Sequence, residues 1–423
     1  MSILTDEKYN YYVKILKDEL VPAMGCTEPI SIAYASAKAR DVLGSFPDRC
    51  EITVSGNIIK NAKSVVVPHT GGLKGIEAAL VAGLVGGKSE ARLEVLSHVS
   101  ADEIVRMREV ISSLPITVLL SESDYPFDIC IRLFSGEDNA LVRIVGRHTN
   151  IVTIEKNGEL LHSKEFTDTQ KAEKKELSVA EILEFANSVD IEDVKPTLKR
   201  QIDYNMAIAR EGLRGEWGAS VGKVYLACYN DDVSVRAKAY AAAGSDARMN
   251  GCELPVIINS GSGNQGMTAS IPVYIYWEHM GLGEEMLYRA LCVSNLLTLH
   301  VKYGIGTLSA YCGAVVAGAC AGCGIAYLNG GGFREIAHTL VNALAIDSGL
   351  ICDGAKASCA AKIATAVENG ILGYYIFKTG RQFVGGDGIV KKGVENTIDS
   401  VTRLARDGMT ITDKEILAIM LED

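Results

Sequence analysis

The most constraining feature of the sequence is a long stretch without charge. Residues 303–333 carry no charged side chain, and residues 304–328 alone have the length of a membrane-spanning helix. However, 12 of those 25 residues are Gly or Ala, and neither basic anchors nor a second apolar span accompany them. Small side chains instead allow helices to pack closely. We therefore expect a central helix, or a pair of helices, buried inside a helical bundle, and no membrane span.

Length and composition narrow the class of protein. The chain has 423 residues, which suggests two or three domains, and 48% of them are hydrophobic, which excludes disorder as the main state. The formal net charge is −10, and no basic patch interrupts the acidic surface that this charge implies. A nucleic-acid partner is therefore not expected.

The cysteines indicate a reducing environment. There are 11 of them, an odd number, and residues 1–19 are charged and lack the apolar segment of a secretory signal. We expect free thiols in the cytoplasm and no disulfide framework. For any single cysteine, a buried structural role remains the alternative.

Local patterns predict an α+β fold with a mainly helical domain and a smaller α/β domain. We place the N-terminal part of the helical domain at residues 1–90, the small α/β insert at 91–170 and the rest of the helical domain at 171–423. Residues 167–176 are polar and resemble a surface linker. Capping boxes are expected at Ser100, Ser178 and Thr412. Strands are expected at 51–55, 116–120, 128–134, 141–145 and 151–155, with an Asn157-Gly158 hairpin before 160–162.

Cys26 is the first candidate for chemistry. It lies in Gly25-Cys26-Thr27-Glu28-Pro29, directly before a helical run, with Thr27 as the expected N-cap. The partial positive charge of a helix N-terminus favours thiolate. A thiolate there could act as a base, a nucleophile or a metal ligand, whereas a packing cysteine beside a cap is the structural alternative.

The segment Ser260-Gly-Ser-Gly-Asn-Gln-Gly266 is the second candidate. Backbone N–H groups in such a loop bind carboxylate or phosphate, and Asn264 and Gln265 add side-chain amides. The closing Gly-Lys-Ser/Thr of a P-loop is missing, and no βαβ unit of a dinucleotide fold surrounds the loop. A tight turn without function is the alternative.

Spacing alone does not decide which later cysteines act together. On one continuous helix Cys312 and Cys323 would lie roughly 16 Å apart, too far to bind one cubane cluster. Cys320 and Cys323 form a C-x-x-C pair that could hold a metal or simply pack. Cys352 and Cys359 flank an Asp353-Gly354 turn, so their thiols could converge.

Three motifs together resemble the L-cysteine desulfidase family, which is related to the iron–sulfur-dependent L-serine dehydratases through their α-chain-like domain. The motifs are Gly-Cys-Thr-Glu-Pro at 25–29, Ser-Gly-Ser-Gly-Asn-Gln-Gly at 260–266, and Cys352-Asp-Gly with Ser358-Cys359. The likeness runs from about Val21 to Gly388 and is weakest in the insert.

The resemblance implies a [4Fe–4S] cluster on Cys312, Cys352 and Cys359, whose separations of 40 and 7 residues match the family's. It implies a catalytic role for Cys26, the reaction of L-cysteine to pyruvate, ammonia and hydrogen sulfide, and an iron–sulfur catalytic domain formed by the helical residues. Cys320 and Cys323 then become packing residues. The substrate pocket would be lined by Asn57, Lys60, Ser260, Ser262, Asn264 and Gln265.

Two departures favour cysteine over serine as the substrate. The Ser-Ser-His-Thr motif of the serine dehydratases is missing, and no cysteine follows Cys359. As the base that removes the α-proton we expect Cys26, with a pKa lowered by the helix end and by Lys60. A second role for Cys26 would be to cap the fourth iron at rest.

Other functions stay open at this point. An L-serine dehydratase would use the same cluster. A pyridoxal-phosphate lyase would use the glycine-rich loop as phosphate cup and Lys356 or Lys362 as Schiff base. A non-catalytic iron–sulfur sensor is the third alternative. The expected partner is a small amino acid, and Ala/Gly-rich helices are also compatible with a homodimer.

Overall fold

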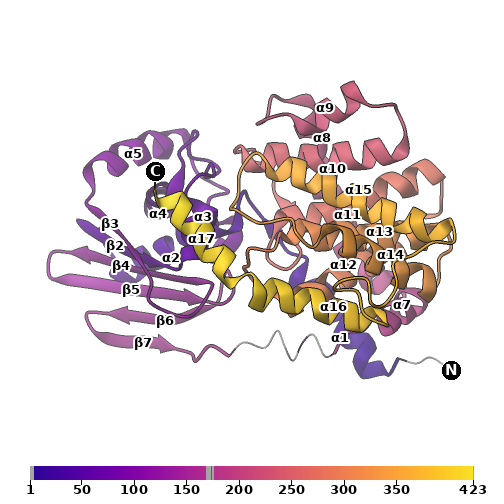
Figure 1. Ribbon diagram of the computed structural model, residues 1–423. Coiled ribbons are helices and arrows are strands. Elements are labelled where there is room, and N and C mark those ends of the chain that lie inside the picture. The colour runs from indigo at the N-terminus through magenta and orange to yellow at the C-terminus, as the bar shows by residue number, and fades with distance from the viewer. Residues whose placement is uncertain (1–3, 168–172, 174–175, 423) are drawn as a thin grey trace.

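The protein consists of a helical part and a sheet part that lie side by side (Figure 1). The computed structural model describes residues 4–167, 173 and 176–422. The α+β fold with a mainly helical domain is confirmed. The linker predicted at 167–176 falls almost entirely outside the described residues. Within the described part of the chain, no helix is long and apolar enough to cross a membrane.

The centre of the helical part is α13 (Gly313–Leu328), which contacts α11, α12, α14 and α15. Every residue of this helix from Ala314 to Leu328 is buried. The buried central helix expected from the uncharged stretch is therefore confirmed, although α12 ends at Ile305 and a loop separates it from α13. The helices of this part are α1 (Asp6–Glu19), α7 (Val179–Ser188), α8 (Ile191–Arg214), α9 (Val221–Cys228), α10 (Val233–Met249), α11 (Gly263–Met280), α12 (Glu284–Ile305), α14 (Phe333–Asp347), α15 (Cys359–Lys378) and α16 (Val394–Arg403).

Glycines set the distance between α13 and α15. A Cβ atom at Gly318 would lie 2.4 Å from the backbone of Ala366, and one at Gly322 would lie 2.2 Å from the carbonyl oxygen of Gly370. The contacts advance in step along both helices, so the helices run parallel and their N-termini lie at the same end. The backbones approach closely because these positions have no side chain.

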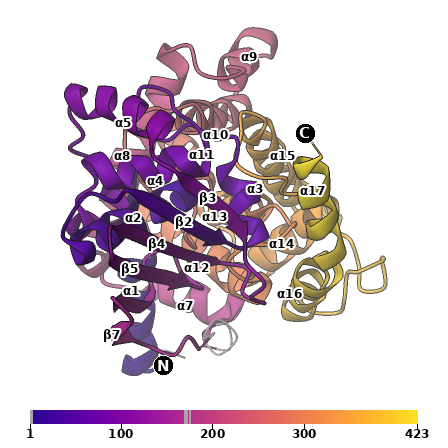
Figure 2. The same cartoon turned by 90° about the vertical axis from the view of Figure 1, so that its left-hand side faces the viewer.

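The sheet part contains six strands in the order β3-β2-β4-β5-β6-β7 and stands in front of the helical part in Figure 2. β2 pairs in parallel with β3, and the other neighbours are antiparallel. Because β2 precedes residue 91, the segments 1–90 and 91–170 share one sheet; the predicted boundary between them stays a prediction. α2 covers one face of the central strands. The elements here are α2 (Thr27–Leu43), β2 (Arg49–Val54), α3 (Gly56–Ala62), α4 (Gly75–Gly86), a 3₁₀ segment (Ser89–Glu94), α5 (Ala101–Ser113), β3 (Ile116–Leu120), β4 (Asp128–Ser135), β5 (Asp138–Val145), β6 (Ile151–Lys156) and β7 (Glu159–Ser163).

Most local signals are confirmed, but the predicted start of the last helix is wrong. Ser100 forms the expected capping box, Ser178 accepts from the backbone of Glu181, and Asn157 and Gly158 both have positive φ in the β6–β7 hairpin. Thr412, however, does not begin the last helix, because α17 runs from Thr410 to Leu421. A π-helical turn (Leu404–Gly408) leads directly into α17, and the N–H of Asp413 bonds to the carbonyl of Met409, so Thr412 already lies inside the first turn of the helix.

Gly322→Ala should destabilise the protein, because the new methyl group would meet the backbone of α15 and could not be accommodated by a side-chain rotation. We expect a loss of about 1–3 kcal/mol in the free energy of unfolding, measured by urea denaturation. Gly349→Ala is the control, since a Cβ atom there meets nothing within 4 Å. Equal stability of the two variants would contradict the role given to this helix contact.

Candidate functional site

A short strand pair brings the first two motifs together. β1 (Pro22–Ala23) pairs antiparallel with β8 (Val256–Ile257), and the N–H of Ile258 bonds to the carbonyl of Val21. From this pair, one segment leads into Cys26 and the other into the 260–266 loop. The hydroxyl of Thr27 closes this arrangement by donating to the carbonyl of Gly261 at 2.9 Å.

Cys26, rather than Thr27, is the N-cap of α2, and its thiol donates to Oε2 of Glu28 at 3.0 Å. Burial raises the pKa of Cys26 well above its usual value, and the charge of Glu28 raises it further, while Arg248 acts in the opposite direction. The lowered pKa that the sequence predicts is therefore wrong. Because burial and a neighbouring carboxylate both disfavour the thiolate, they outweigh the helix N-terminus.

Glu28 is a buried carboxylate with several partners. Oε1 accepts from Asn61 at 3.3 Å and lies 3.8 Å from Nε2 of His148, and Oε2 accepts from Cys26. Burial alone would raise the pKa of Glu28, but the interactions with His148 and Cys26 lower it to about 2. Glu28 is thus a permanently ionised carboxylate in the first turn of α2.

The 260–266 loop ends at the N-terminus of α11. Ser260 and Gly261 have φ angles of 49° and 76°, and a Cβ atom at Gly261 would lie 2.6 Å from the ring of His148, so glycine is required there. Asn264 accepts from Nη1 of Arg248 at 3.1 Å. The side chain of Gln265 lies against Gly313 at the start of α13, and its buried Oε1 has no hydrogen-bond partner among the described residues.

Backbone contacts bring the three predicted cluster cysteines together. Cys312 is the N-cap of α13, and Cys359 is the first residue of the parallel helix α15. Tyr311 and Ile351 form a β-bridge, in which the N–H of Cys352 bonds to the carbonyl of Ala310 at 2.6 Å and that of Cys312 to the carbonyl of Leu350 at 3.1 Å. The Asp353-Gly354 turn then leads back to Cys359, whose thiol faces the carbonyl of Gly354 at 3.6 Å.

The three thiols influence one another electrostatically. Burial raises the pKa of Cys312 to about 12, and charge on Cys352 and Cys359 contributes in the same direction. Burial also raises the pKa of Cys359. Clustered thiols of this kind become thiolates when a cation binds to them. In the described part of the chain no three His, Cys, Asp or Glu side chains are close enough to hold a single metal ion. A cubane cluster makes a different demand, because each cysteine binds a different iron.

One cavity of about 100 Å³ joins these elements. It contains Cys26 together with all three predicted cluster cysteines, and four of the six predicted substrate-binding residues. The side chains and backbone that line it include Cys26, Thr27, Glu28, Asn61, His148, Arg248, Ser260, Ser262, Asn264, Gln265, Lys302, Cys312, Cys352, Gly354 and Cys359.

Asn57 and Lys60 line a neighbouring cavity of about 870 Å³ between the sheet part, the helical part and α17. The buried ammonium group of Lys60 pairs with Asp413 of α17. The two cavities meet at Thr307, Leu308 and Ser309. The structure therefore does not place Asn57 and Lys60 with the cysteines, and their role in substrate binding stays a prediction.

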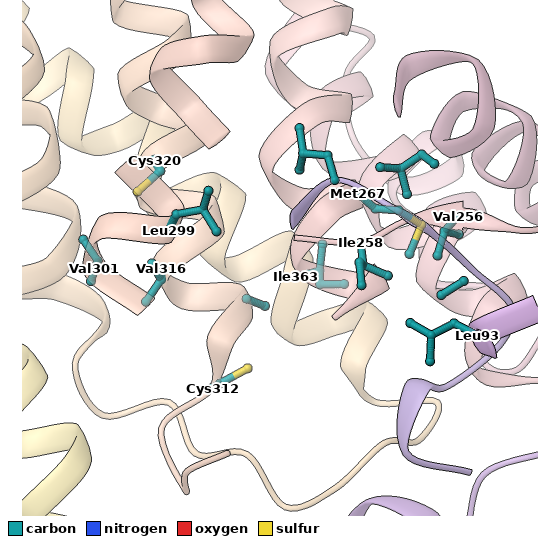
Figure 3. Close-up of a cluster of buried hydrophobic side chains, with 14 of the residues drawn as sticks. Leu93, Val256, Ile258, Met267, Leu299, Val301, Cys312, Val316, Cys320 and Ile363 are labelled. Atoms are coloured by element: carbon teal, nitrogen blue, oxygen red, sulfur yellow. The ribbon is translucent and has the colours of Figure 1, made fainter. Parts of the chain in front are cut away.

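The C-x-x-C pair packs in the core. Cys320 and Cys323 are fully buried, and the thiol of Cys323 faces the carbonyl of Ile336 at 3.5 Å. Figure 3 shows Cys312 at the start of α13 and Cys320 further along the helix, with their sulfur atoms on opposite sides.

Several charged residues of the cavity were not expected from the sequence. Arg248 and Lys302 are buried, and burial lowers the pKa of both, that of Lys302 to about 8. Lys302 had a signal, since it is the last charge before the uncharged stretch. His148, which reaches the cavity from the loop after β5, had none.

Comparison with known proteins identifies the family. Residues 90–418 match the model of the serine dehydratase alpha chain. The chain belongs to the serine dehydratase alpha chain family. The matched residues include Arg248, the 260–266 loop and the three cysteines, so the cavity is built largely from the serine dehydratase-like domain of a lyase-type enzyme.

Whole-length relatives extend the similarity to the segment that carries Cys26. A UPF0597 protein of Desulfitobacterium hafniense is 58% identical over 419 residues, which cover 98% of this chain and 97% of the relative. A UPF0597 protein of Lachnoclostridium phytofermentans is 52% identical over 98% and 100% of the two chains. A third, from Actinobacillus pleuropneumoniae, is 36% identical over 97% and 96%.

Glu28→Gln should change how stability depends on pH. The pKa of Glu28 is lowered in the folded state, so the carboxylate stabilises the fold above the unfolded-state pKa, and this contribution is lost as the pH falls from about 4.5 to about 2. It amounts to at most about 3 kcal/mol. Urea unfolding at several pH values should show a flatter acid limb for Glu28→Gln than for the wild type, and no such change for the exposed control Glu159→Gln. Parallel curves would contradict the assignment.

Proposed function

We propose that the protein is an L-cysteine desulfidase, a lyase that uses a [4Fe–4S] cluster to eliminate sulfide from L-cysteine and yields pyruvate, ammonia and hydrogen sulfide. The observation that carries this proposal is the convergence of Cys312, Cys352 and Cys359 with Cys26 on one cavity. These residues come from separate parts of the sequence, and a hydrophobic core alone does not require four thiols to meet.

The donor set fits an iron–sulfur cluster. Cys312, Cys352 and Cys359 match the preference of iron–sulfur clusters for thiolate ligands and would hold the cluster. The ammonium group of the buried Lys302 is close enough to Cys312 and Cys352 to interact with their charge, which would offset the negative charge of thiolates. Bound there, such a cluster would supply Lewis acidity toward the departing sulfur atom.

The other residues of the cavity supply proton chemistry and positioning. Cys26 is the candidate base: after its thiol proton is lost to solvent, the thiolate would take the proton from the α-carbon of the substrate, while the carboxylate of Glu28, 3.0 Å from the sulfur, stays ionised. The electron pair of that C–H bond then forms the Cα–Cβ double bond, and the C–S electrons leave with sulfur. The product 2-aminoacrylate tautomerises and is hydrolysed to pyruvate and ammonia. Arg248 favours this thiolate, because its charge opposes the effects of burial and Glu28 on the pKa of Cys26.

A small substrate suits the cavity. Its volume of about 100 Å³ is well below the roughly 300–1,000 Å³ of pockets for larger ligands. Two features of the sequence support cysteine over serine, namely the missing Ser-Ser-His-Thr motif and the lack of a cysteine after Cys359. L-Serine dehydration at the same site is the second candidate function, favoured by the name of the matched family.

The structure offers little support for a pyridoxal-phosphate lyase. Lys356 and Lys362, the candidate Schiff-base residues, both pair with Asp353. An iron–sulfur sensor would not need the Cys26–Glu28 pair beside the cluster site, so the same cavity favours an enzyme over a sensor.

Replacing Cys312, Cys352 or Cys359 with Ala should each abolish the brown colour of anaerobically purified protein, because each removes one of three cluster ligands. Iron and acid-labile sulfide analysis with the absorption spectrum measures this. Cys320→Ala, which changes a core thiol of the same helix as Cys312, is the control and should keep its cluster. A variant at 312, 352 or 359 that retains full iron content would remove that residue from the ligand set.

Cys26→Ala should keep the cluster and lose turnover, because it removes the base but none of the three ligands. We expect a fall of about 10²–10⁴-fold in kcat for sulfide and pyruvate release from L-cysteine, with L-serine assayed in parallel. Cys292→Ala is a control for loss of a buried thiol elsewhere. Near-normal activity of Cys26→Ala with an intact cluster would refute its role, and faster turnover of serine than of cysteine by the wild type would favour the dehydratase.

A further inference from the structure

Two buried cations at the cavity lack a carboxylate partner. Arg248 is 2% exposed and Lys302 is 5% exposed. Neither takes part in any ion pair found among the described residues. Because a buried charge is costly unless it is compensated, each of them calls for an anion in the cavity.

The two cations have different surroundings. Lys302 interacts with Cys352 and Cys312 and also with Glu28, and its ammonium group donates to the backbone carbonyls of Gly306 and Thr307. Arg248 interacts with Cys26, Glu28 and Cys359. The carboxylate of Glu28 is already engaged by Cys26 and Asn61, so Arg248 is left without a carboxylate of its own.

The unused edge of Arg248 is well defined. Nη1 donates to Asn264, whereas Nε is buried and has no hydrogen-bond partner in the described part of the chain. A Cβ atom at Gly263 would lie 2.5 Å from this Nε. The N–H without a partner therefore lies against the first residue of α11, where a side chain would collide with it.

The N-terminus of α11 adds donors at the same place. The helix has 18 residues, and its N-cap, Ser262, makes no side-chain capping bond. The first-turn N–H groups of an α-helix have no partner within the helix, and they carry partial positive charge. A guanidinium N–H beside such a turn forms a receptor for a planar carboxylate.

We propose that Arg248 and the N-terminus of α11 bind the α-carboxylate of the amino-acid substrate. This assignment rests on the proposed function for the identity of the ligand. It gives Ser260, Ser262 and Asn264 a role as the frame around the carboxylate. A carboxylate bound there would hold the α-carbon of the substrate near Cys26, because Arg248 is close enough to Cys26 to interact with its charge. Substrates without a free carboxylate should bind poorly.

Binding of two substrate fragments tests the proposal without turnover. 3-Mercaptopropionate has the thiol and the carboxylate, and cysteamine has the thiol and the amine. Their dissociation constants are measured by anaerobic calorimetry on the cluster-containing full chain. Arg248→Gln should raise the dissociation constant of 3-mercaptopropionate by about 10–150-fold, which is the effect of losing a hydrogen bond to a charged group. The dissociation constant of cysteamine should stay within about twofold of the wild-type value. Arg236→Gln, on the same helix but at the surface, should change neither.

A second variant serves if Arg248→Gln does not fold. Asn264→Asp places a carboxylate where Arg248 already has a hydrogen bond, at an almost unchanged shape. Asn264→Asp should keep or raise the melting temperature. It should lower the affinity for 3-mercaptopropionate and leave the affinity for cysteamine equal or higher. Unchanged affinity for 3-mercaptopropionate in either folded variant, or an equal loss for both ligands, would overturn the proposal.

The outcomes also separate this inference from the proposed function. If the wild type releases no sulfide from L-cysteine but the fragment affinities change as described in the Arg248 variant, Arg248 binds carboxylates and the proposed desulfidase reaction is wrong. If sulfide is released and the fragment affinities do not depend on Arg248, the reaction stands and the receptor is elsewhere.

Discussion

The close contact between α13 and α15 is the constraint on which the site depends. Gly318, Gly322 and Gly370 let the two backbones touch, and parallel packing puts both helix N-termini at one end. Cys312 and Cys359 occupy those N-termini. The β-bridge between Tyr311 and Ile351 then places Cys352 next to them. The thiols are therefore positioned by backbone geometry, which is stiffer than any arrangement of long side chains.

Charge distinguishes this cavity from the surrounding core. Most of the helical part is apolar, yet the cavity holds the carboxylate of Glu28, the guanidinium of Arg248 and the ammonium group of Lys302. Among the described residues, both oxygens of Glu28 accept hydrogen bonds, whereas Arg248 and Lys302 donate to neutral oxygens and form no ion pair with a carboxylate. A fold does not retain buried cations without anions for its own stability, because hydrophobic replacements of similar volume are usually at least as stable. The charges of Arg248 and Lys302 are better explained by anionic ligands that bind in the cavity and neutralise them.

Short-range signals predicted most elements but only part of the site. The buried central helix, the Ser100 box, the Asn157-Gly158 hairpin and the partnership of distant motifs followed from local pattern and resemblance. The pKa of Cys26 did not, because a helix N-terminus is visible in the sequence whereas burial and the orientation of the Glu28 carboxylate are not. The predicted start of the last helix at Thr412 was also wrong, because a π-helical turn after α16 leads into α17 two residues earlier. Asn57 and Lys60 line the neighbouring cavity instead, where the ammonium group of Lys60 pairs with Asp413 of α17.

The sequence by itself determined which residue types are available: small residues for close helix contact, a cysteine before α2, two cysteines around a turn, and a glycine-rich loop before α11. Those features are local, so residue type and spacing are enough to reveal them. Tertiary structure alone decided which of them meet. The β1–β8 pair brings Cys26 to the loop, and His148 and Arg248 reach the cavity from elements far apart in the chain. Electrostatic balance in a cavity depends on distance and burial, and these arise only when the chain has folded.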